Sequence, residues 1–409
     1  MMDDRKIYYS GNGGAFRIFI AKNSENYFIP HLDDSLSIWE KQFILGYAKR
    51  LGFNNNLFNF NGKTFKENCQ YEWYDLSDDI LNAIIKNKKE IRDIYDNIIT
   101  TDQLQIASYA AKMIRNKNTF YKIINQILPN NFVTNWRIIN DITLLKDYSY
   151  DFIYPVIIKS CNGKGGKGNI ICNNPLEIQF VEQIFSSSLF AKKQEDHVYN
   201  IKDEIIVERF FPNCPSYNLS FYCTPNGKME NANIAEQIIE EVFYRGNMYP
   251  TQLNEQEQKN IYQMGNDICH YINNKLGYFG WIGLDFIKIN DKICVIEANP
   301  RINSVTHAYN LVQGNAFIIR LMKYQEQNRK QIFCKFYFNQ LTKTGILPYQ
   351  LPNRNEALII SIAPRINEAK MQLKNFITET KMCPTKQLQV SNYSKSLSYY
   401  LLNKSEFEK

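Results

Sequence analysis

The residues with the clearest chemical potential are two carboxylates, Asp285 and Glu297, in a stretch of alternating apolar and polar side chains at residues 283–301. Two strand-like runs flank the polar sequence Asn-Asp-Lys at residues 290–292, which is a pattern typical of a β-hairpin. If these three residues form the turn, Asp285 lies directly opposite Glu297, and Asn299 follows on the same face. A two-residue turn would instead make the two acids diagonal neighbours.

Opposed carboxylates at these two positions repel each other and destabilise a bare sheet. A divalent cation between them removes that repulsion, and oxygen ligands suit Mg²⁺, particularly when the phosphates of a substrate complete its coordination shell. The alternative is a surface hairpin with incidental acids. The hairpin alone leaves both interpretations open.

A glycine-rich basic loop at residues 162–168 lies between two strand-like runs, 156–160 and 169–172. Its glycines fit the pattern G-x-G-x-x-G, but a dinucleotide-binding fold needs a helix after this loop, and here a strand-like run follows. No Gly-Lys-Ser/Thr closes the loop as a Walker motif, and the His-Arg-Asp and Asp-Phe-Gly motifs of protein kinases are missing from the sequence. We favour a glycine hairpin whose backbone N–H groups approach phosphates, with Lys164 and Lys167 adding charge. A merely flexible hairpin is the alternative.

Two lysines and one glutamate occupy positions that need a specific partner. Lys159 precedes the glycine loop inside an otherwise apolar strand, where a buried ammonium needs an anion unless its stem reaches solvent. Lys117 begins a predicted helix, where a cation opposes the helix dipole unless it points at something anionic. The strand-like run at residues 204–211 can present backbone groups to an adenine edge while Glu208 accepts the adenine amino group, or it can form a core edge strand.

Taken in order along the chain, these features resemble the ATP-grasp superfamily of enzymes. The matching elements are a lysine at a helix start, Tyr-Pro-Val-Ile-Ile-Lys before the glycine loop, Ile-Val-Glu-Arg-Phe at residues 206–210, and an aspartate followed by Glu-Ala-Asn-Pro-Arg at residues 297–301. Each motif is weak alone, but four in this order over roughly 200 residues are specific as a set.

A narrower resemblance is to the pheganomycin-type peptide ligases and their relatives in natural-product pathways. It is carried by Pro-Ser-Tyr-Asn-Leu-Ser at residues 215–220, Glu-Gln-Ile-Ile at 236–239, Tyr-Arg-Gly-Asn-Met-Tyr-Pro at 244–250 and Gly-Ile-Leu-Pro-Tyr-Gln-Leu-Pro at 345–352. Proteins of this group also carry an N-terminal α/β domain before the ATP-grasp and a small C-terminal domain after it.

The resemblance implies an ATP-grasp fold of mixed α+β and α/β class, in which two α+β subdomains enclose ATP. The implied nucleotide-binding residues are Lys117, Lys159, Gly163, Lys164, Gly165, Gly166, Lys167, Gly168, Glu208, Arg209, Phe210 and Asn218. The implied ligands of one or two Mg²⁺ ions, which Mn²⁺ can replace, are Asp285, Glu297 and Asn299. Arg301 is the implied catalytic residue, because it would stabilise the acyl phosphate and the tetrahedral intermediate. Asn218 stands where many members of the superfamily bind the ribose through an acid, although an amide can still accept a hydroxyl proton.

The implied domains are an N-terminal α/β domain at residues 1–115, an ATP-grasp domain at 116–330 and a small C-terminal α+β domain at 331–409. The ATP-grasp domain divides into subdomains at about residues 116–210 and 211–330. Within the first domain, amphipathic patterns predict helices at residues 79–98 and 101–114.

The implied function is an ATP-dependent carboxylate–amine ligase that forms a peptide or amide bond through an acyl phosphate, in natural-product or amino-acid conjugate biosynthesis. Its substrates would be a small-molecule carboxylate and an amine, such as an amino acid or a peptide. Two alternatives stay open: an ATP-binding module without ligase activity, and an ATP-grasp kinase or carboxylase.

The composition limits the partners and the compartment. The chain has 409 residues, of which 44% are hydrophobic and 22% charged, and its net charge of +7 is modest. It lacks the dense Lys/Arg stripe of a nucleic-acid-binding protein, so no nucleic-acid partner is expected. Nine cysteines without a Cys-x-x-Cys pair suit a reducing compartment. We expect a cytoplasmic protein with no membrane partner, because neither a signal peptide nor a membrane-length apolar run is found; the oligomeric state is open.

Overall fold

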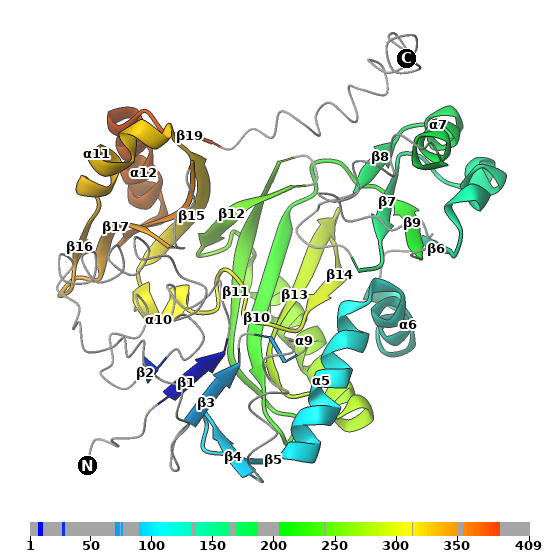
Figure 1. The fold of residues 1–409 in the computed structure, drawn as a ribbon, viewed down its shortest axis with the longest axis horizontal. Helices are drawn as coiled ribbons and strands as arrows, with labels where there is room; N and C mark the ends of the chain where they lie inside the picture. Colours follow the sequence, from blue (N-terminus) through cyan, green and yellow to red (C-terminus); the bar gives the residue numbers. More distant parts are fainter. Residues whose placement is uncertain are drawn as a thin grey trace.

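The structure is a computed structural model. It describes residues 7–10, 27–28, 70–73, 75–76, 90–131, 136–162, 169–186, 204–240, 243–312, 314–349 and 355–384. Within these residues the strands form a five-stranded sheet, a four-stranded sheet and a ten-stranded sheet. Figure 1 shows the large sheet in the middle, the four-stranded sheet with helix α7 at the upper right and the N-terminal strands below. No helix of the described parts is long and apolar enough to cross a membrane.

The N-terminal sheet has the order β2-β1-β3-β4-β5, in which only β5 runs antiparallel to its neighbour. Its strands are β1 (Ile7–Ser10), β2 (Tyr27–Phe28), β3 (Gln70–Trp73), β4 (Glu90–Asp93) and β5 (Ile98–Thr100). The predicted helix at residues 79–98 is wrong over β4 and the start of β5; the earlier part, 79–89, lies outside the described residues. In β4 the burial alternates, with Ile91 and Asp93 inward, which is the period of a strand and not of a helix.

Helices α5 (Thr101–Arg115) and α6 (Lys117–Ile127) lead from this sheet to the four-stranded one, whose order is β6-β9-β7-β8 and whose strands are all antiparallel. Its elements are η2 (Pro129–Asn131), β6 (Trp136–Ile139), η3 (Ile142–Asp151), β7 (Val156–Ser160), β8 (Ile170–Cys172), α7 (Pro175–Ser186) and β9 (Ile205–Arg209). Strand β9 is therefore central in this sheet and not a core edge strand.

The large sheet has the order β14-β13-β10-β11-β12-β15-β18-β17-β16, with β19 paired to β15. Its strands are β10 (Ser216–Cys223), β11 (Met229–Glu240), β12 (Phe243–Tyr249), β13 (Gly280–Ile289), β14 (Lys292–Asn299), β15 (Ala316–Lys323), β16 (Tyr337–Asn339), β17 (Thr344–Pro348), β18 (Glu356–Ala363) and β19 (Cys383–Pro384). The helices that accompany it are α9 (Glu255–Leu276), α10 (Ala308–Val312), η5 (Glu326–Asn328), α11 (Arg329–Cys334) and α12 (Ile366–Thr380).

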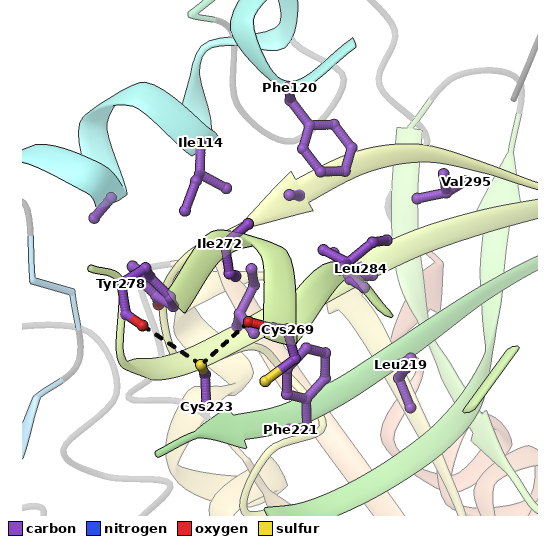
Figure 2. Close-up of a cluster of buried hydrophobic side chains, with 14 of the residues drawn as sticks. Ile114, Phe120, Leu219, Phe221, Cys223, Cys269, Ile272, Tyr278, Leu284 and Val295 are labelled. Atoms are coloured by element: carbon purple, nitrogen blue, oxygen red, sulfur yellow. Dashed lines mark hydrogen bonds between the residues drawn. The ribbon is translucent and has the colours of Figure 1, made fainter. Parts of the chain in front are cut away.

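Strand β10 shows how this sheet separates its core face from its polar face. Leu219 and Phe221 belong to the buried apolar cluster that also contains Ile272 of α9 (Figure 2). Because strand side chains alternate between faces, Asn218 and Ser220 point to the opposite side. The polar face of β10 and β13 is thus the one available for chemistry.

A second apolar cluster joins β15 to the C-terminal strands and to α12, including Phe317, Ile360 and Phe376. The large sheet therefore runs across residue 330, where the sequence places the boundary of the C-terminal domain. The two domain boundaries and the subdomain boundary stay predictions.

Candidate functional site

The hairpin of β13 and β14 carries the two acids. Its register differs from both registers that the sequence suggested, one with a three-residue turn and one with a two-residue turn. The turn consists of Asn290 and Asp291 alone, so the predicted three-residue turn is wrong. The register then shifts by one residue at Ile296, which pairs with no residue of β13, and Asp285 comes to lie directly opposite Glu297. The shift has the form of a β-bulge, which adds one residue to one strand of a pair. The acids are thus opposed because of the bulge and not because of the turn.

Asp285 is surrounded by side-chain amides. Its Oδ1 accepts hydrogen bonds from Asn218 Nδ2 at 2.6 Å and from Gln237 Nε2 at 3.0 Å. Its Oδ2 accepts one from Asn299 Nδ2 at 3.0 Å. Removal from water, and then the charge of Glu297, raise the pKa of Asp285 to about 7, although the amide hydrogen bonds from Asn218 and Gln237 act in the opposite direction.

Glu297 contacts the first of the two lysines. Lys117 Nζ lies 3.1 Å from Glu297 Oε1, and the Lys117 side chain is only 5% exposed. Lys117 is the first residue of α6, and its backbone N–H donates to the carbonyl of Cys161 at 3.0 Å. The start of α6 therefore contacts both the acid hairpin of β13 and β14 and Cys161, which follows β7 directly before the glycine loop.

Lys159 and Glu208 form a buried ion pair between the neighbouring strands β7 and β9. The other oxygen of Glu208 accepts a hydrogen bond from the hydroxyl of Tyr121 at 2.5 Å. Burial, followed by the charge of Glu208, raises the pKa of Tyr121 well above its usual range. The anion that stabilises a lysine in this apolar strand is thus Glu208.

Arg209 ends β9, and Phe210 follows it directly. The Arg209 guanidinium lies over the ring of Phe211, 5.0 Å from its centroid. The backbone N–H of Phe210 donates to the carbonyl of Pro155 at 2.7 Å. Adenine contacts of Glu208, Arg209 and Phe210 stay predictions.

Arg301 follows the hairpin, two residues after Asn299 at the end of β14. Its guanidinium makes two long contacts, at 3.4 Å to Asn299 Oδ1 and at 3.4 Å to the carbonyl of Ile302. Its charge opposes the rise in the pKa of Asp285. Among the described residues, the hydrogen-bond partners of the Arg301 guanidinium are thus neighbours in its own turn.

The predicted site residues fall into two groups in space. One group, on the polar face of the large sheet and at the start of α6, contains Lys117, Asn218, Asp285, Glu297, Asn299 and Arg301. The other, on the four-stranded sheet, contains Lys159, Glu208, Arg209 and Phe210. Gly163, Lys164, Gly165, Gly166, Lys167 and Gly168 lie outside the described residues.

Sequence reasoning missed Gln237 and Tyr121, which contact Asp285 and Glu208. Gln237 lies in β11 and reaches Asp285 across β10. A period-two pattern identifies which face Gln237 is on, but only the strand order brings it to the acid, so no sequence signal was available for that contact.

The oxygen atoms around Asp285 and Glu297 fit a hard divalent cation. Two opposed carboxylates and the amide of Asn299 supply oxygen ligands, which Mg²⁺ prefers. Asn218 Oδ1 is buried and has no hydrogen-bond partner among the described residues. No third acid, histidine or cysteine joins the acids in the part of the chain that the structure describes. Amide oxygens and a ligand's own oxygens would therefore complete the shell.

Known proteins resemble this chain in part of its sequence and in its fold. A family model described as L-aspartate–L-methionine ligase, ATP grasp, matches residues 136–299, which include the four-stranded sheet and strands β10 to β14 of the large sheet with the acid hairpin. The chain has the ATP-grasp fold. No curated protein sequence matches it significantly.

Solved structures share this fold over most of the length of the chain. The biotin carboxylase of Campylobacter jejuni, in complex with a β,γ-ATP, has a TM-score of 0.59 at 11% identity and covers 93% of this chain and 92% of that one. The biotin carboxylase domain of the Hydrogenobacter thermophilus 2-oxoglutarate carboxylase, in complex with MgADP, ADP and bicarbonate, has a TM-score of 0.58 at 12% identity, covering 93% and 91%. The Aspergillus clavatus carboxyaminoimidazole ribonucleotide synthase, complexed with ATP, has a TM-score of 0.57 at 14% identity, covering 92% and 98%.

Proposed function

We propose that this ATP-grasp protein is an ATP- and Mg²⁺-dependent carboxylate–amine ligase that joins amino acids or short peptides through an acyl phosphate. The observation that carries the proposal is the opposed pair Asp285 and Glu297, with Lys117 on one side and Arg301 on the other. The match to a family model of an L-aspartate–L-methionine ligase supports amino acids as the substrate class.

Asp285, Glu297 and Asn299 would hold Mg²⁺, which would supply positive charge against the negative charge that develops during phosphoryl transfer. Lys117 and Lys159 would contact the phosphates. Lys159 precedes the glycine loop in the sequence, and the backbone N–H of Lys117 bonds to Cys161, which also precedes that loop. Glu208 lies on the neighbouring strand, where it can accept the adenine amino group.

The reaction has two steps. An oxygen of the substrate carboxylate attacks the γ-phosphorus, the bond to the bridging oxygen breaks, and ADP leaves with that electron pair. The amine nitrogen then attacks the acyl carbon, the carbon–oxygen bond to phosphate breaks, and the amine loses a proton to solvent or phosphate. Arg301 offsets the negative oxygen of the tetrahedral intermediate, as preorganised donors do in acyl transfer.

The test is ADP release with pairs of amino acids and short peptides, beginning with L-aspartate and L-methionine. A ligase releases ADP and phosphate only when an acid and an amine are both present. With hydroxylamine in place of the amine, it converts the acid to a hydroxamate, which reports the acyl phosphate directly.

Other outcomes would favour the competing functions. ADP release from the acid alone, without amine and without hydroxamate formation, indicates a kinase. ADP release that requires bicarbonate indicates a carboxylase. If Mg-ATP raises the melting temperature but no acid–amine pair gives ADP, the chain is an ATP-binding module.

A further inference from the structure

Three residues of the N-terminal region, Trp73, Asp75 and Leu76, contact both strands at the open end of the acid hairpin, away from its turn, and we call them the N-terminal anchor. They are only 3%, 9% and 2% exposed. The Trp73 ring meets that of Phe279 edge-on, 6.2 Å between centroids. Leu76 Cδ1 lies 3.0 Å from the position that a Cβ on Gly280 would take. The anchor thus packs against the residues that begin β13.

The anchor also contacts the second strand at this end of the hairpin, just after β14, where Arg301 lies. Asp75 forms an antiparallel backbone bridge with Arg301, the residue that follows β14 and Pro300. One short segment therefore fixes the start of the strand that carries Asp285 and the turn that carries Arg301.

The carboxylate of Asp75 is held by Arg115, at the end of α5. Arg115 Nη2 lies 2.6 Å from Asp75 Oδ1 and 2.5 Å from Oδ2, and the two side chains are 22% and 10% exposed. Charge-assisted contacts of this length, in a mostly buried place, are among the stronger polar interactions of a protein. Two residues after Arg115, Lys117 contacts Glu297. The junction between α5 and α6 therefore contacts the acid pair directly and Arg301 through Asp75.

Arg301 is fixed through its backbone and much less through its side chain. Its backbone N–H donates to the carbonyl of Asn299 at 2.8 Å, and its carbonyl accepts from Asn303 Nδ2 at 3.1 Å. Its guanidinium has only the two contacts of 3.4 Å within its own turn, among the hydrogen bonds of the described residues. The placement of the guanidinium hence depends on the turn, and the turn depends on the bridge to Asp75.

We propose that Asp75 and Arg115 are positioning residues for Arg301, so that the N-terminal region completes the ligase site. This inference rests on the proposed function, in which Arg301 stabilises negative charge in the transition state. Such stabilisation requires a donor fixed at the place where the charge develops. A misplacement of about 1 Å can lower a rate by about a hundredfold. Asp75 touches no substrate in this proposal and acts only through the backbone of Arg301.

The experiment uses the full chain with Asp75→Asn and Arg115→Lys. The first variant removes the charge of Asp75 but keeps its shape. The second keeps the positive charge at position 115 but lacks the planar guanidinium with its several N–H donors. We expect Asp75→Asn to lower kcat by about tenfold to a hundredfold, with the KM for ATP and the Mg-ATP thermal shift within about twofold of wild type. Arg115→Lys should give a smaller fall in kcat, with the same constant KM.

Hydrogen exchange gives a readout that needs no activity. In both variants the backbone amides of residues 301–306 should exchange faster, while those in the middle of β13 keep their rates. The matched control is Lys288→Met, which breaks another partly buried ion pair of the same hairpin, between Lys288 and Glu257 at 2.6 Å. It should lower the melting temperature without changing kcat or the exchange of residues 301–306.

Each outcome decides a separate point. A wild-type kcat in a folded Asp75→Asn protein overturns the inference, as does an equal fall in kcat in Lys288→Met. If Asp75→Asn does not fold, Arg115→Lys decides alone, and a wild-type kcat there overturns the inference. If the wild-type protein releases no ADP with any acid–amine pair, the proposed function fails, while the exchange of residues 301–306 still tests the bridge.

Discussion

The Lys117 ammonium lies 3.1 Å from Glu297 Oε1, so the lysine that we assign to ATP contacts a carboxylate that we assign to Mg²⁺. Binding of Mg-ATP would give each of them a new partner, phosphate for the lysine and metal for the glutamate. Before that, the ion pair offsets charge in a place where Asp285 and Glu297 repel each other. Without ligand, Lys117 and Glu297 therefore neutralise each other, and with Mg-ATP each would be neutralised by the ligand instead.

Lys117→Met should raise the KM for ATP by about tenfold, since it removes one buried phosphate partner worth about 1.4 kcal/mol. The same change should lower the melting temperature of the nucleotide-free protein, because Glu297 loses its counter-charge. Steady-state kinetics and a thermal melt measure the two effects. Lys122→Met, at an exposed position of the same helix, is the control and should change neither. An unchanged KM in Lys117→Met would remove this lysine from the nucleotide site.

Glu297→Gln should lower turnover by at least about a hundredfold, because a neutral amide is a much poorer ligand for the metal. The change keeps the size of the side chain, so the fold should be retained. Turnover is measured as ADP release over a range of Mg²⁺ concentrations. Asp291→Asn, in the exposed turn of the same hairpin, is the matched control. Wild-type turnover in Glu297→Gln would contradict the metal assignment.

The contact between Lys159 and Glu208 makes a prediction about stability. Lys159→Met alone leaves a buried carboxylate without its cation and should destabilise the protein by about 3–5 kcal/mol. The double variant Lys159→Met with Glu208→Gln should recover most of that loss, while ATP binding stays weak in both. Urea unfolding measures the stabilities and calorimetric titration measures the binding. A double variant less stable than Lys159→Met would show that the two side chains do not compensate each other.

The acid hairpin shows how far sequence reasoning reaches. Alternation of apolar and polar residues identified both strands and the shared face of Asp285 and Glu297, because that information is local. The bulge at Ile296 has no sequence signature, yet it determines that the acids are opposed. The turn length and the bulge each shift the register by one residue, so the predicted opposition is correct although the predicted turn is wrong.

Contacts between segments far apart in the chain could not be predicted from the sequence. Lys117 and Lys159 each suggested an unknown anion, because a buried cation needs one. The identities of those anions, Glu297 and Glu208, follow from packing between elements far apart in the chain. The helix predicted at residues 79–98 failed for a related reason. Over β4 and β5 the chain pairs with itself across a turn at Asp96, whose φ is +64°, and tertiary pairing outweighs a weak helical periodicity.

Asp285 supplies the last prediction, which concerns stability in the absence of ligands. Burial and Glu297 raise the pKa of Asp285 to about 7, whereas an unfolded aspartate titrates near pH 4. Between these values the folded protein keeps a proton that the unfolded chain has lost. Stability from this group is therefore full below about pH 4, declines as the pH rises and is lost above about pH 7. Asp285→Asn removes this pH dependence.

We expect Asp285→Asn to abolish turnover yet to stabilise the ligand-free protein at pH 8 by about 1–2 kcal/mol. This gain in stability is smaller than the full pKa shift of Asp285 would give. An asparagine at position 285 cannot accept all the hydrogen bonds that the carboxylate accepts, including the one from Asn299 Nδ2. At pH 5 the gain should be smaller, since the wild-type carboxyl is then protonated. Urea unfolding at the two pH values measures the difference, and Asp291→Asn serves as the exposed control. Equal effects of Asp285→Asn at both pH values would mean that the ionised acid is not a source of instability, and that the amides of Asn218, Gln237 and Asn299 already satisfy its charge before any metal binds.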